Sequence, residues 1–467
     1  MNLLGLELCD AGILVAGGEP PRLLRVDEDE SESPGFALPE KKSLVTGRAA
    51  ERRARLLPRQ IMNRFWEQLS TDPLEPPLHA AGNQAEVACA HLAHIWEPAR
   101  HFGNSLVIAV PGFFQRTQLG LLVGMAQELG IPLQGFVSQP VAAAVAGPEG
   151  LHLHVDIHLH RWEVSVLKVN GRLEFKEAFS VNEKGLEGLY KLWVQAAAAE
   201  FVRMTRFDPL HSAETEQELY RRLPAVLAAL QQEQAAMIAI PAGHSHYSIS
   251  LPRAVLLETV RPVYDELLAV VHDARRRHAA AGTAVVFEVS QRVARLPGIR
   301  ARLRQTPNTR VVELPAGAAA LALPALWREL TAGRRPAGAS FFSSRPWNAA
   351  ASVSASDHVL ATPRPTHLLY RHLAYPITAS PLTIGAAPPE EGCGIRIEGE
   401  PGGIDSRHCS VHLQGGQAVL TDLSASGTFL NDRRAGGPEA LRVGDAIRVG
   451  NAAEAIMVIA CLDRNEA

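Results

Sequence analysis

The stretch LHLHVDIHLH carries the residues whose types and spacing come closest to a metal site. Histidine or aspartate stands at every second position, at His152, His154, Asp156, His158 and His160. On one continuous β-strand these side chains would share a face, and zinc accepts imidazole and carboxylate ligands. The alternation also fits a strand that presents polar side chains to a solvated cleft, so the pattern alone leaves both interpretations open.

The composition is that of a globular protein with more than one core. The chain has 467 residues, of which 46% are hydrophobic and 20% are charged, and its formal net charge is −3. This length is enough for two or three domains. The sequence has neither a basic excess nor a polybasic run, so we expect no nucleic-acid partner and no binding to a membrane surface.

The cysteines and the first residues predict a cytoplasmic location. The five cysteines are scattered and form no C-x-x-C pair, which is typical of reduced thiols. The opening MNLLGLELCD lacks a basic region and reaches an acid within its first residues, so we expect no signal peptide. The most apolar stretch, Val311 to Leu326, is interrupted by prolines and is too short to span a membrane.

A change in composition divides the chain. Residues 331–366 are rich in Ala, Ser, Pro and Arg and show no helical or strand period. Such a segment cannot bury enough surface to offset the entropy of ordering it. We therefore predict a flexible linker at 331–366, between an N-terminal domain of residues 1–330 and a C-terminal domain of residues 367–465.

Strand and helix patterns alternate through the N-terminal domain. Apolar runs predict strands at Leu3–Leu8, Ile13–Ala16, Ser105–Val110, Leu153–Ile157, Trp162–Val169 and Ala284–Val289. Helical periods run through Asn83–Trp96, Arg116–Leu129, Leu186–Val202, Thr215–Gln232 and Leu251–His272. This alternation predicts an α/β domain with buried sheets. Short strands with Gly-rich turns predict a β-sandwich in the C-terminal domain.

Residues 107–147, VIAVPGFFQRTQLGLLVGMAQELGIPLQGFVSQPVAAAVAG, form the most specific pattern of the N-terminal domain. A strand ends in Val-Pro, a helix and a short strand follow, and Gln-Pro opens an Ala-rich helix. This order resembles the nucleotide-binding domain of DnaK-type heat-shock chaperones, members of the actin-like ATPase superfamily, which carry V-P-A-x-F and E-P-T-A-A-A-x-A-x-G at matching spacing. Weaker similarities extend over residues 1–330, so the resemblance implies a two-lobed actin-like ATPase fold.

The resemblance also implies a site for ATP and Mg²⁺, with Glu7, Gln139 and Asp156 as the candidate catalytic residues. Glycines let phosphates approach the backbone in such loops, and here they are missing. Other residues take their places: Cys9-Asp10-Ala11 and His158-Leu159-His160 in the two phosphate loops, and Glu288-Val289-Ser290 in the adenosine motif. We therefore expect a degenerate ATPase that binds ATP weakly or not at all.

The same resemblance bears on the alternating histidines. It places a tight turn at about residues 158–161, which would break the shared face of the strand. We therefore assign no metal site.

Four motifs between residues 383 and 450 identify the C-terminal domain. They are Thr383-Ile384-Gly385, Ser406-Arg407-His408-Cys409-Ser410-Val411, SASGTFLND from Ser424, and LRVGDAIRVG from Leu441. In order they are similar to the G-R, S-R-x-H-A-x-I, S-x-N-G-T-F-V-N-G and L-x-x-G-D-x-I-x-L-G motifs of forkhead-associated (FHA) domains. The second motif has one residue fewer between its arginine and histidine.

FHA domains bind phosphothreonine peptides through loops at one end of the sandwich. The resemblance therefore implies a peptide-binding surface at Gly385, Ser406, Arg407, Ser426 and Asn431. The arginine that follows the family's glycine is Ala386 here, and the asparagine before Gly-Thr is Ser426. Because a phosphate needs guanidinium and hydroxyl donors, we expect a protein partner whose binding depends little on phosphothreonine.

Together these features predict a cytoplasmic scaffold or regulatory protein, in which a pseudo-ATPase domain is joined to a divergent FHA domain. Two alternatives remain open. The first is a slow ATPase whose nucleotide state gates what the FHA domain binds. The second is a phosphothreonine-dependent signalling adaptor.

Overall fold

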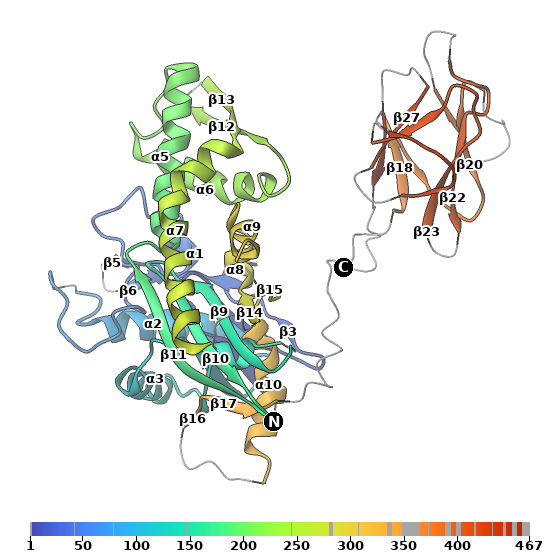
Figure 1. Cartoon of the computed structure of the whole chain (residues 1–467). Coiled ribbons are helices and arrows are strands. Elements are labelled where there is room, and N and C mark those ends of the chain that lie inside the picture. The colour runs from blue at the N-terminus through green and yellow to red at the C-terminus, as the bar shows by residue number, and fades with distance from the viewer. Residues whose placement is uncertain are drawn as a thin grey trace. The chain divides into compact units, whose positions relative to one another are not determined.

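The computed structural model describes residues 2–459 except 42, 78, 146, 244, 280–283, 307, 334–338, 348–364, 372, 388–393, 398–402, 415–416, 432, 442–444 and 451–454. The chain forms two compact units, Met1–Ser354 and Ala355–Ala467. Figure 1 shows helices and sheets in the first unit and strands in the second. The predicted α/β and all-β classes are therefore confirmed.

Two large sheets form the framework of the first unit. Sheet one contains β1 (Leu3–Glu7), β2 (Ile13–Gly17), β3 (Arg22–Leu23), β4 (Glu32–Ser33), β7 (Ser105–Val110), β8 (Leu133–Ser138) and β16 (Ser340–Phe342). Sheet two contains β9 (Gly150–Ile157), β10 (Arg161–Val169), β11 (Arg172–Asn182), β14 (Val285–Val289), β15 (Thr309–Glu313) and β17 (Ser344–Pro346). Small hairpins are made by β5 (Ala37–Glu40) with β6 (Ser43–Thr46), and by β12 (Ala235–Ala242) with β13 (Ser245–Pro252).

The two sheets repeat one topology. In sheet one, β1, β2 and β3 form an antiparallel meander, and β7 and then β8 are added in parallel on the other side of β1. In sheet two, β9, β10 and β11 form the meander, and β14 and then β15 are added in parallel beside β9. The first unit is therefore built from two halves with the same strand order.

Helices cover these sheets and add a lobe at one end of the unit. They are α1 (Arg48–Glu51), α2 (Gln84–Ala99), α3 (Arg116–Glu128), α4 (Gln139–Ala143), α5 (Leu186–Thr205), α6 (Ala213–Ala229), α7 (Arg253–His278), α8 (Gln291–Ala294), α9 (Ile299–Arg304) and α10 (Ala318–Thr331). Helices α5 and α6 gather with the β12–β13 hairpin at the upper end in Figure 1. The long helix α7 joins this lobe to β10 and β11.

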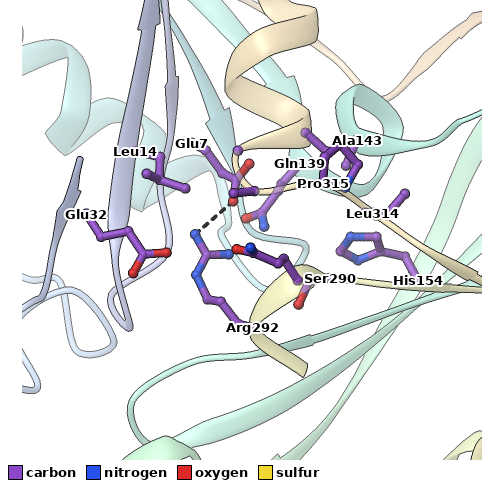
Figure 2. Close-up of a pocket in the computed structure, with 14 residues that line it drawn as sticks. Glu7, Leu14, Glu32, Gln139, Ala143, His154, Ser290, Arg292, Leu314 and Pro315 are labelled. Carbon is purple, nitrogen blue, oxygen red and sulfur yellow. Dashed lines mark hydrogen bonds and ion pairs between the residues drawn. The ribbon is translucent and has the colours of Figure 1, made fainter. Parts of the chain in front are cut away.

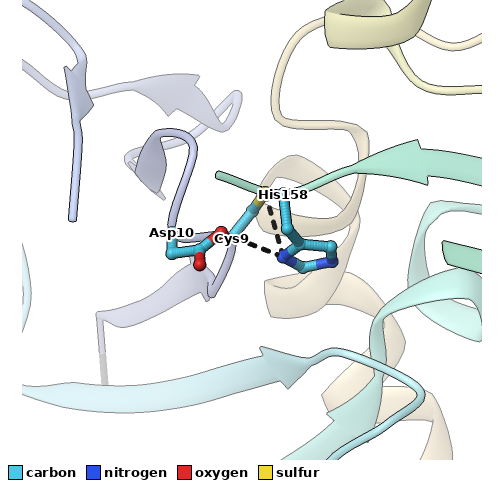
Figure 3. A group of neighbouring side chains, drawn as sticks. All are labelled: Cys9, Asp10 and His158. Carbon is cyan, nitrogen blue, oxygen red and sulfur yellow. Dashed lines mark hydrogen bonds and ion pairs between the residues drawn. The ribbon is translucent and has the colours of Figure 1, made fainter. Parts of the chain in front are cut away.

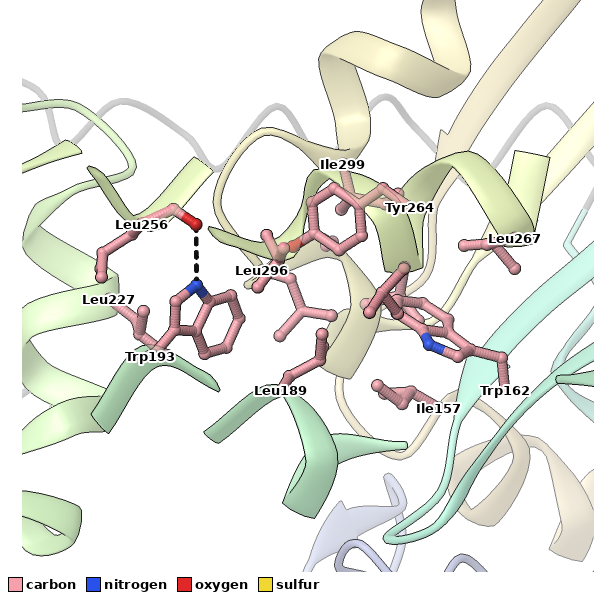
Figure 4. Packing of buried hydrophobic residues seen from close by; sticks show 14 of the residues in the cluster. Ile157, Trp162, Leu189, Trp193, Leu227, Leu256, Tyr264, Leu267, Leu296 and Ile299 are labelled. Carbon is pink, nitrogen blue, oxygen red and sulfur yellow. Dashed lines mark hydrogen bonds between the residues drawn. The ribbon is translucent and has the colours of Figure 1, made fainter. Parts of the chain in front are cut away.

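Buried apolar side chains hold each half together. In the core of the second half, the rings of Trp162 and Tyr264 meet edge to face at 6.2 Å, and the Trp193 indole N–H donates to the Leu256 carbonyl at 3.1 Å (Figure 4). A separate cluster from β7, α4, β10 and α10 joins the two halves. It fixes the start of α4 and of α10 close to the ends of β1 and β9.

The second unit is a β-sandwich. One sheet contains β18 (His367–Tyr370), β19 (Leu373–Pro376), β24 (Thr428–Leu430), β25 (Arg433–Arg434), β27 (Ala446–Val449) and β28 (Ile456–Ile459). The other contains β20 (Leu382–Gly385), β21 (Gly394–Arg396), β22 (Cys409–Gln414), β23 (Gln417–Asp422) and β26 (Glu439–Ala440). Their apolar side chains share one core, as alternation along short strands predicts.

The predicted linker at 331–366 is wrong for part of its length. Helix α10 continues to Thr331, strand β16 pairs in parallel with β8, and β17 pairs with β11. Phe342 packs edge to face on Trp327 with ring centroids 5.4 Å apart. Short edge strands carry too little pattern to be read from composition. Residues 348–364 of the predicted linker lie outside the described residues.

No helix in the described part of the chain is long and apolar enough to cross a membrane.

Candidate functional site

A small pocket lies where the two halves of the first unit meet. It is lined by Glu7, Leu14, Glu32, Gln139, Ala143, His154, Ser290, Gln291, Arg292, Leu314, Pro315, Ala316, Gly317 and Ala318 (Figure 2). Glu7 ends β1, Gln139 begins α4, and Arg292 stands in the short helix after β14. Its free volume is about 10 Å³, which is about the space of one water molecule.

The Arg292 guanidinium fills the centre of this pocket. Its Nη2 donates to Glu7 Oε1 and to the Gly12 carbonyl, each at 2.8 Å, and its Nη1 lies 3.5 Å from Asp156 Oδ2. Burial alone would lower the pKa of Arg292, but the Cys9 thiol and the carboxylates of Glu7 and Asp156 outweigh burial and hold that pKa well above its usual value. The pocket therefore contains the positively charged Arg292 side chain, which is paired with the carboxylates of Glu7 and Asp156.

The structure brings the three predicted catalytic residues together. The Gln139 amide donates to Asp156 Oδ2 at 2.7 Å, and the Ser290 hydroxyl and the Ile157 N–H donate to Asp156 Oδ1 at 2.5 and 2.8 Å. Glu7 Oε2 accepts the Ala319 N–H at 3.1 Å. Burial would raise the pKa of Asp156, but Arg292 and nearby histidines lower it overall. The Asp156 carboxylate is therefore ionised, and the carboxylates of Glu7 and Asp156 are both already hydrogen-bonded within the protein.

The alternating histidines do not share one site. Strand β9 ends at Ile157, and the His158 N–H donates to the Arg161 carbonyl at 2.8 Å, so the chain turns between them. His152 Nδ1 lies 2.9 Å from Glu288 Oε1, whereas His160 Nε2 lies 3.1 Å from the Asn63 carbonyl. The rings of His152 and His160 therefore have different partners, and the buried Nδ1 of His154 has no hydrogen-bond partner among the described residues.

A second polar cluster joins the first turns of the two halves. Cys9, Asp10 and His158 are all buried, although 148 residues separate His158 from Asp10 (Figure 3). His158 Nδ1 lies 3.2 Å from Asp10 Oδ1 and 3.6 Å from Cys9 Sγ. The Leu159 N–H also donates to Asp10 Oδ1, at 2.9 Å. The sequence placed these residues in the two turns that resemble phosphate loops, but it did not predict that their side chains contact one another.

These neighbours shift the pKa of His158. Burial would lower its pKa, but the Cys9 sulfur and the Asp10 carboxylate, both at hydrogen-bonding distance, raise it well above the usual value. Hydrogen bonds from His158 and from the Leu159 N–H in turn lower the pKa of Asp10, against the opposing effect of its burial. Asp10 in the turn of the first half is thus hydrogen-bonded to His158 and Leu159 in the turn of the second half.

In the second unit, three of the predicted peptide-binding loops converge. A Cβ at Gly385 would collide with the Ser406 carbonyl, which also accepts the Ala387 N–H at 3.2 Å. The loop that carries Ser426 is tied to the same place, because the Ala425 N–H donates to Asp405 Oδ2 at 2.9 Å. Ser406, Arg407 and Ser426 are exposed there. We call this surface, formed by residues 385–387, 405–408 and 424–427, the loop rim.

His408 supports the loop rim from below. Its ring is buried, with Nδ1 accepting the Asp405 N–H at 3.1 Å and Nε2 donating to the Gly427 carbonyl at 3.1 Å. This hydrogen bond fixes the backbone of Asp405, which stands three residues before His408, and the Asp405 carboxylate lies at the rim.

One asparagine and one arginine do not lie where the motifs predict. Asn431 follows the far end of β24 from Ser426, where it donates to Asp445 at 2.8 Å and accepts the Ala446 N–H at 2.9 Å. It therefore fastens a hairpin to β27 and does not lie with the other four residues. Arg434 was missed, yet its guanidinium lies against Gly427, and its Nη2 is 3.5 Å from the Ala425 carbonyl.

Comparison with known proteins agrees with the second unit. Residues 382–450 match the FHA domain family, so the chain contains an FHA domain. The matched residues include the whole loop rim. No curated protein matches the chain.

Proposed function

We propose that the chain is a cytoplasmic scaffold or regulatory protein, in which a pseudo-ATPase domain of DnaK-like, actin-like fold carries an FHA module that binds a protein partner. The repeated strand order of the two sheets supports the fold. So does the position of the pocket, which lies between the halves and near the turns that resemble phosphate loops.

The observation that carries the pseudo-ATPase proposal is the ion pair of Arg292 with Glu7 in a pocket of about 10 Å³. Ligand pockets for molecules of nucleotide size are at least about 300 Å³. A magnesium ion would need the oxygens of Glu7 and Asp156, and a guanidinium already neutralises both. Binding Mg-ATP would therefore require breaking a buried ion pair.

The Asp10 carboxylate supports the same proposal. The backbone N–H of Leu159, in the turn that resembles the second phosphate loop, donates to Asp10. Backbone N–H groups of such turns are the donors that phosphates use. Asp10 thus satisfies the donor with an anion from the protein itself.

The FHA module binds its partner, in this proposal, with weak preference for phosphothreonine. In the family motif S-R-x-H the serine stands three residues before the histidine, and in this loop that place belongs to Asp405. A carboxylate there repels a phosphate dianion, while it can accept hydrogen bonds from a neutral or basic peptide.

Titration of the full chain with Mg-ATP tests the pseudo-ATPase proposal. We expect no calorimetric binding with a dissociation constant below about 10 μM, or roughly −7 kcal/mol. ATP at a hundred times such a constant would stabilise the folded unit by about 2.7 kcal/mol. All six tryptophans lie in residues 1–354, so urea unfolding followed by tryptophan fluorescence reports on this unit. Stabilisation of that size, absent with Mg²⁺ alone, would refute the proposal.

A phosphothreonine-dependent adaptor is the second candidate function, and Arg434 favours it. Its exposed guanidinium lies against Gly427 in the loop rim, so together with Arg407 it could supply the second cation that Ala386 lacks. Fluorescence anisotropy with paired phosphorylated and plain peptides separates the candidates. Discrimination of a hundredfold or more would favour the adaptor.

A further inference from the structure

We propose that Cys9, Asp10 and His158 form a zinc site, which holds together the turns of the two halves. The three side chains come from the β1–β2 turn and the β9–β10 turn, and all are at least nine-tenths buried. One ligand atom from each lies within 4.8 Å of the other two. Sulfur, nitrogen and carboxylate oxygen are the ligand set that zinc accepts.

Two of the three distances between the ligand atoms match a tetrahedron around zinc, and the third, from Cys9 Sγ to the Asp10 carboxylate, is within 4.8 Å. Zinc bonds of about 2.3 Å to sulfur and about 2.0 Å to nitrogen and oxygen place sulfur and nitrogen about 3.5 Å apart, and oxygen and nitrogen about 3.3 Å apart. The observed separations are 3.6 Å for Cys9 Sγ to His158 Nδ1 and 3.2 Å for Asp10 Oδ1 to His158 Nδ1. The cluster therefore needs little rearrangement to bind the ion.

A catalytic relay does not explain this geometry. A cysteine–histidine–aspartate relay uses both ring nitrogens, one for the nucleophile and one for the acid. Here Cys9 and Asp10 both face Nδ1 of His158 (Figure 3). A single N–H can satisfy one of them well, and the Cys9 thiol donates to the Ile157 carbonyl at 3.5 Å, whereas a metal ion at that point would bind all three side chains.

The surroundings supply what a buried zinc site requires. Nε2 of His158 faces Glu163 Oε2 at 4.0 Å, and such outer carboxylates orient metal-binding imidazoles. Glu163 is itself held by the Gly112 N–H at 3.1 Å. The Cys9 thiolate and the Asp10 carboxylate would neutralise the dication, which lowers the cost of burying it. Binding releases the Cys9 thiol proton and the Nδ1 proton of His158 to solvent, and it leaves a fourth position for water.

The zinc proposal stands apart from the pseudo-ATPase proposal. Its readout is metal content, whereas the pseudo-ATPase proposal, which rests on the Arg292 pocket and is also supported by Asp10, is tested with ATP. The chain can fail to bind zinc and also fail to bind ATP, and the metal titration and the ATP titration report these two results separately.

The test is a metal titration of the full chain after removal of metal with a chelator. We expect one equivalent of Zn²⁺ per chain in competition with a chromophoric chelator. Co²⁺ should give the tetrahedral d–d bands and the thiolate charge-transfer band of a cysteine ligand. Cys9→Ser and His158→Gln should each weaken Zn²⁺ binding by about a hundredfold or more, and Cys9→Ser should abolish the charge-transfer band.

Cys89→Ser is the matched control, since Cys89 lies in α2 outside the cluster, and it should bind Zn²⁺ like the native chain. Asp10→Asn keeps a hydrogen-bonding side chain of the same size beside His158, so it separates loss of a ligand from loss of folding. Circular dichroism and tryptophan fluorescence verify that each variant folds. Native-like Zn²⁺ affinity in folded Cys9→Ser or Asp10→Asn, or no stoichiometric binding by the native chain, would overturn the proposal.

Discussion

Two aspartates occupy equivalent chemical roles in the two units. Asp10 accepts the Leu159 N–H between the halves of the first unit, and Asp405 accepts the Ala425 N–H in the loop rim of the second. In each unit, a carboxylate of the chain itself therefore satisfies a backbone donor of a neighbouring loop.

Arg292 gives the sharpest prediction for a single residue. Arg292→Met keeps most of the side-chain volume but leaves Glu7 and Asp156 buried without their cation, so we expect a loss of about 3–5 kcal/mol in unfolding free energy. Arg295→Ala is the control, because Arg295 is 63% exposed and lies 4.0 Å from Glu32, and it should change stability by less than about 0.5 kcal/mol. Urea unfolding followed by tryptophan fluorescence measures both. Equal effects would show that the Arg292 ion pair does not stabilise the first unit.

Asp405 should set the preference of the loop rim. We expect the native chain to favour a phosphothreonine peptide over its plain form by about tenfold or less, or roughly 1.4 kcal/mol. Asp405→Asn retains an acceptor for the Ala425 N–H but removes the charge, so it should raise that preference by about tenfold. Peptide anisotropy is the measurement, with Glu439→Gln as a control, since Glu439 pairs with Arg433. An unchanged preference in Asp405→Asn would mean that charge at the rim is irrelevant.

At this scale the sequence predicted residue types better than it predicted contacts. Glu7 and Asp156 lie at the ends of the buried strands β1 and β9, and Gln139 follows β8. Their meeting was predictable from the resemblance, and the structure brings them together. That Arg292 points at Glu7 depends on how α8 packs, and no local pattern reveals it. Asn431 was placed with the rim because a motif spans both ends of β24, although the two ends of a strand face different surfaces.

Strands and helices were predictable from the sequence where their apolar pattern extends over many residues. Strand β7 was predicted to the residue, and helix α3 within one residue, because long apolar periods fix them. Strands β16 and β17 were missed, since each has three residues and depends on pairing with distant strands. Pairing partners far along the chain are a tertiary effect that composition does not contain.

Strand β16 should contribute to the stability of the first unit. Phe342 packs on Trp327, whereas its neighbour Phe341 is 46% exposed. We expect Phe342→Ala to lower the unfolding free energy by about 2 kcal/mol, and Phe341→Ala to lower it by less than about 0.5 kcal/mol. Urea unfolding of the full-length variants checks this. If Phe342→Ala proved as mild as Phe341→Ala, residues 340–342 would be a linker after all.

The long connection between β2 and α2 is fastened by a buried histidine. His91 Nδ1 accepts the Trp66 indole N–H at 3.0 Å, and its Nε2 lies 2.8 Å from the Ser33 hydroxyl, which donates to Asp27 at 2.6 Å. Burial, aided by neighbouring His94 and opposed by Asp27, lowers the pKa of His91 to about 3. The ring is therefore neutral in the folded protein.

This histidine should make the first unit sensitive to acid. The unfolded chain protonates His91 near pH 6.5 and the folded chain only near pH 3, so its stability is full above pH 6.5 and falls as the pH drops towards 3. Between pH 7 and 5 the loss is about 2 kcal/mol. His91→Gln cannot take up the proton, so its stability should fall by about 2 kcal/mol less over that interval. His101→Gln, at an exposed position, should behave like the native chain, and a native-like loss in His91→Gln would contradict the assignment.

At the scale of the whole molecule, the two units raise the question of communication. The slow-ATPase alternative requires nucleotide in the first unit to change what the FHA domain binds. A ligand shifts an equilibrium only by its differential affinity for two states. If the pocket refuses ATP, no such difference exists, and ATP cannot act on the FHA domain through it.

We therefore expect peptide binding by the full chain to be independent of nucleotide. The dissociation constant of a fluorescent peptide selected on the native chain should change by less than about twofold with 1 mM Mg-ATP, whereas allosteric coupling is typically about 5–150-fold. Anisotropy titrations with Mg-ATP, Mg-ADP and Mg²⁺ alone measure this. Arg292→Met is the informative variant, because it removes the cation that neutralises Glu7 and Asp156. A fivefold or larger change with Mg-ATP on the native chain would establish the nucleotide-gated alternative. A change in peptide affinity seen only in Arg292→Met would mean that nucleotide in the first unit can still alter peptide binding. Arg292 would then be the residue that prevents this in the native chain.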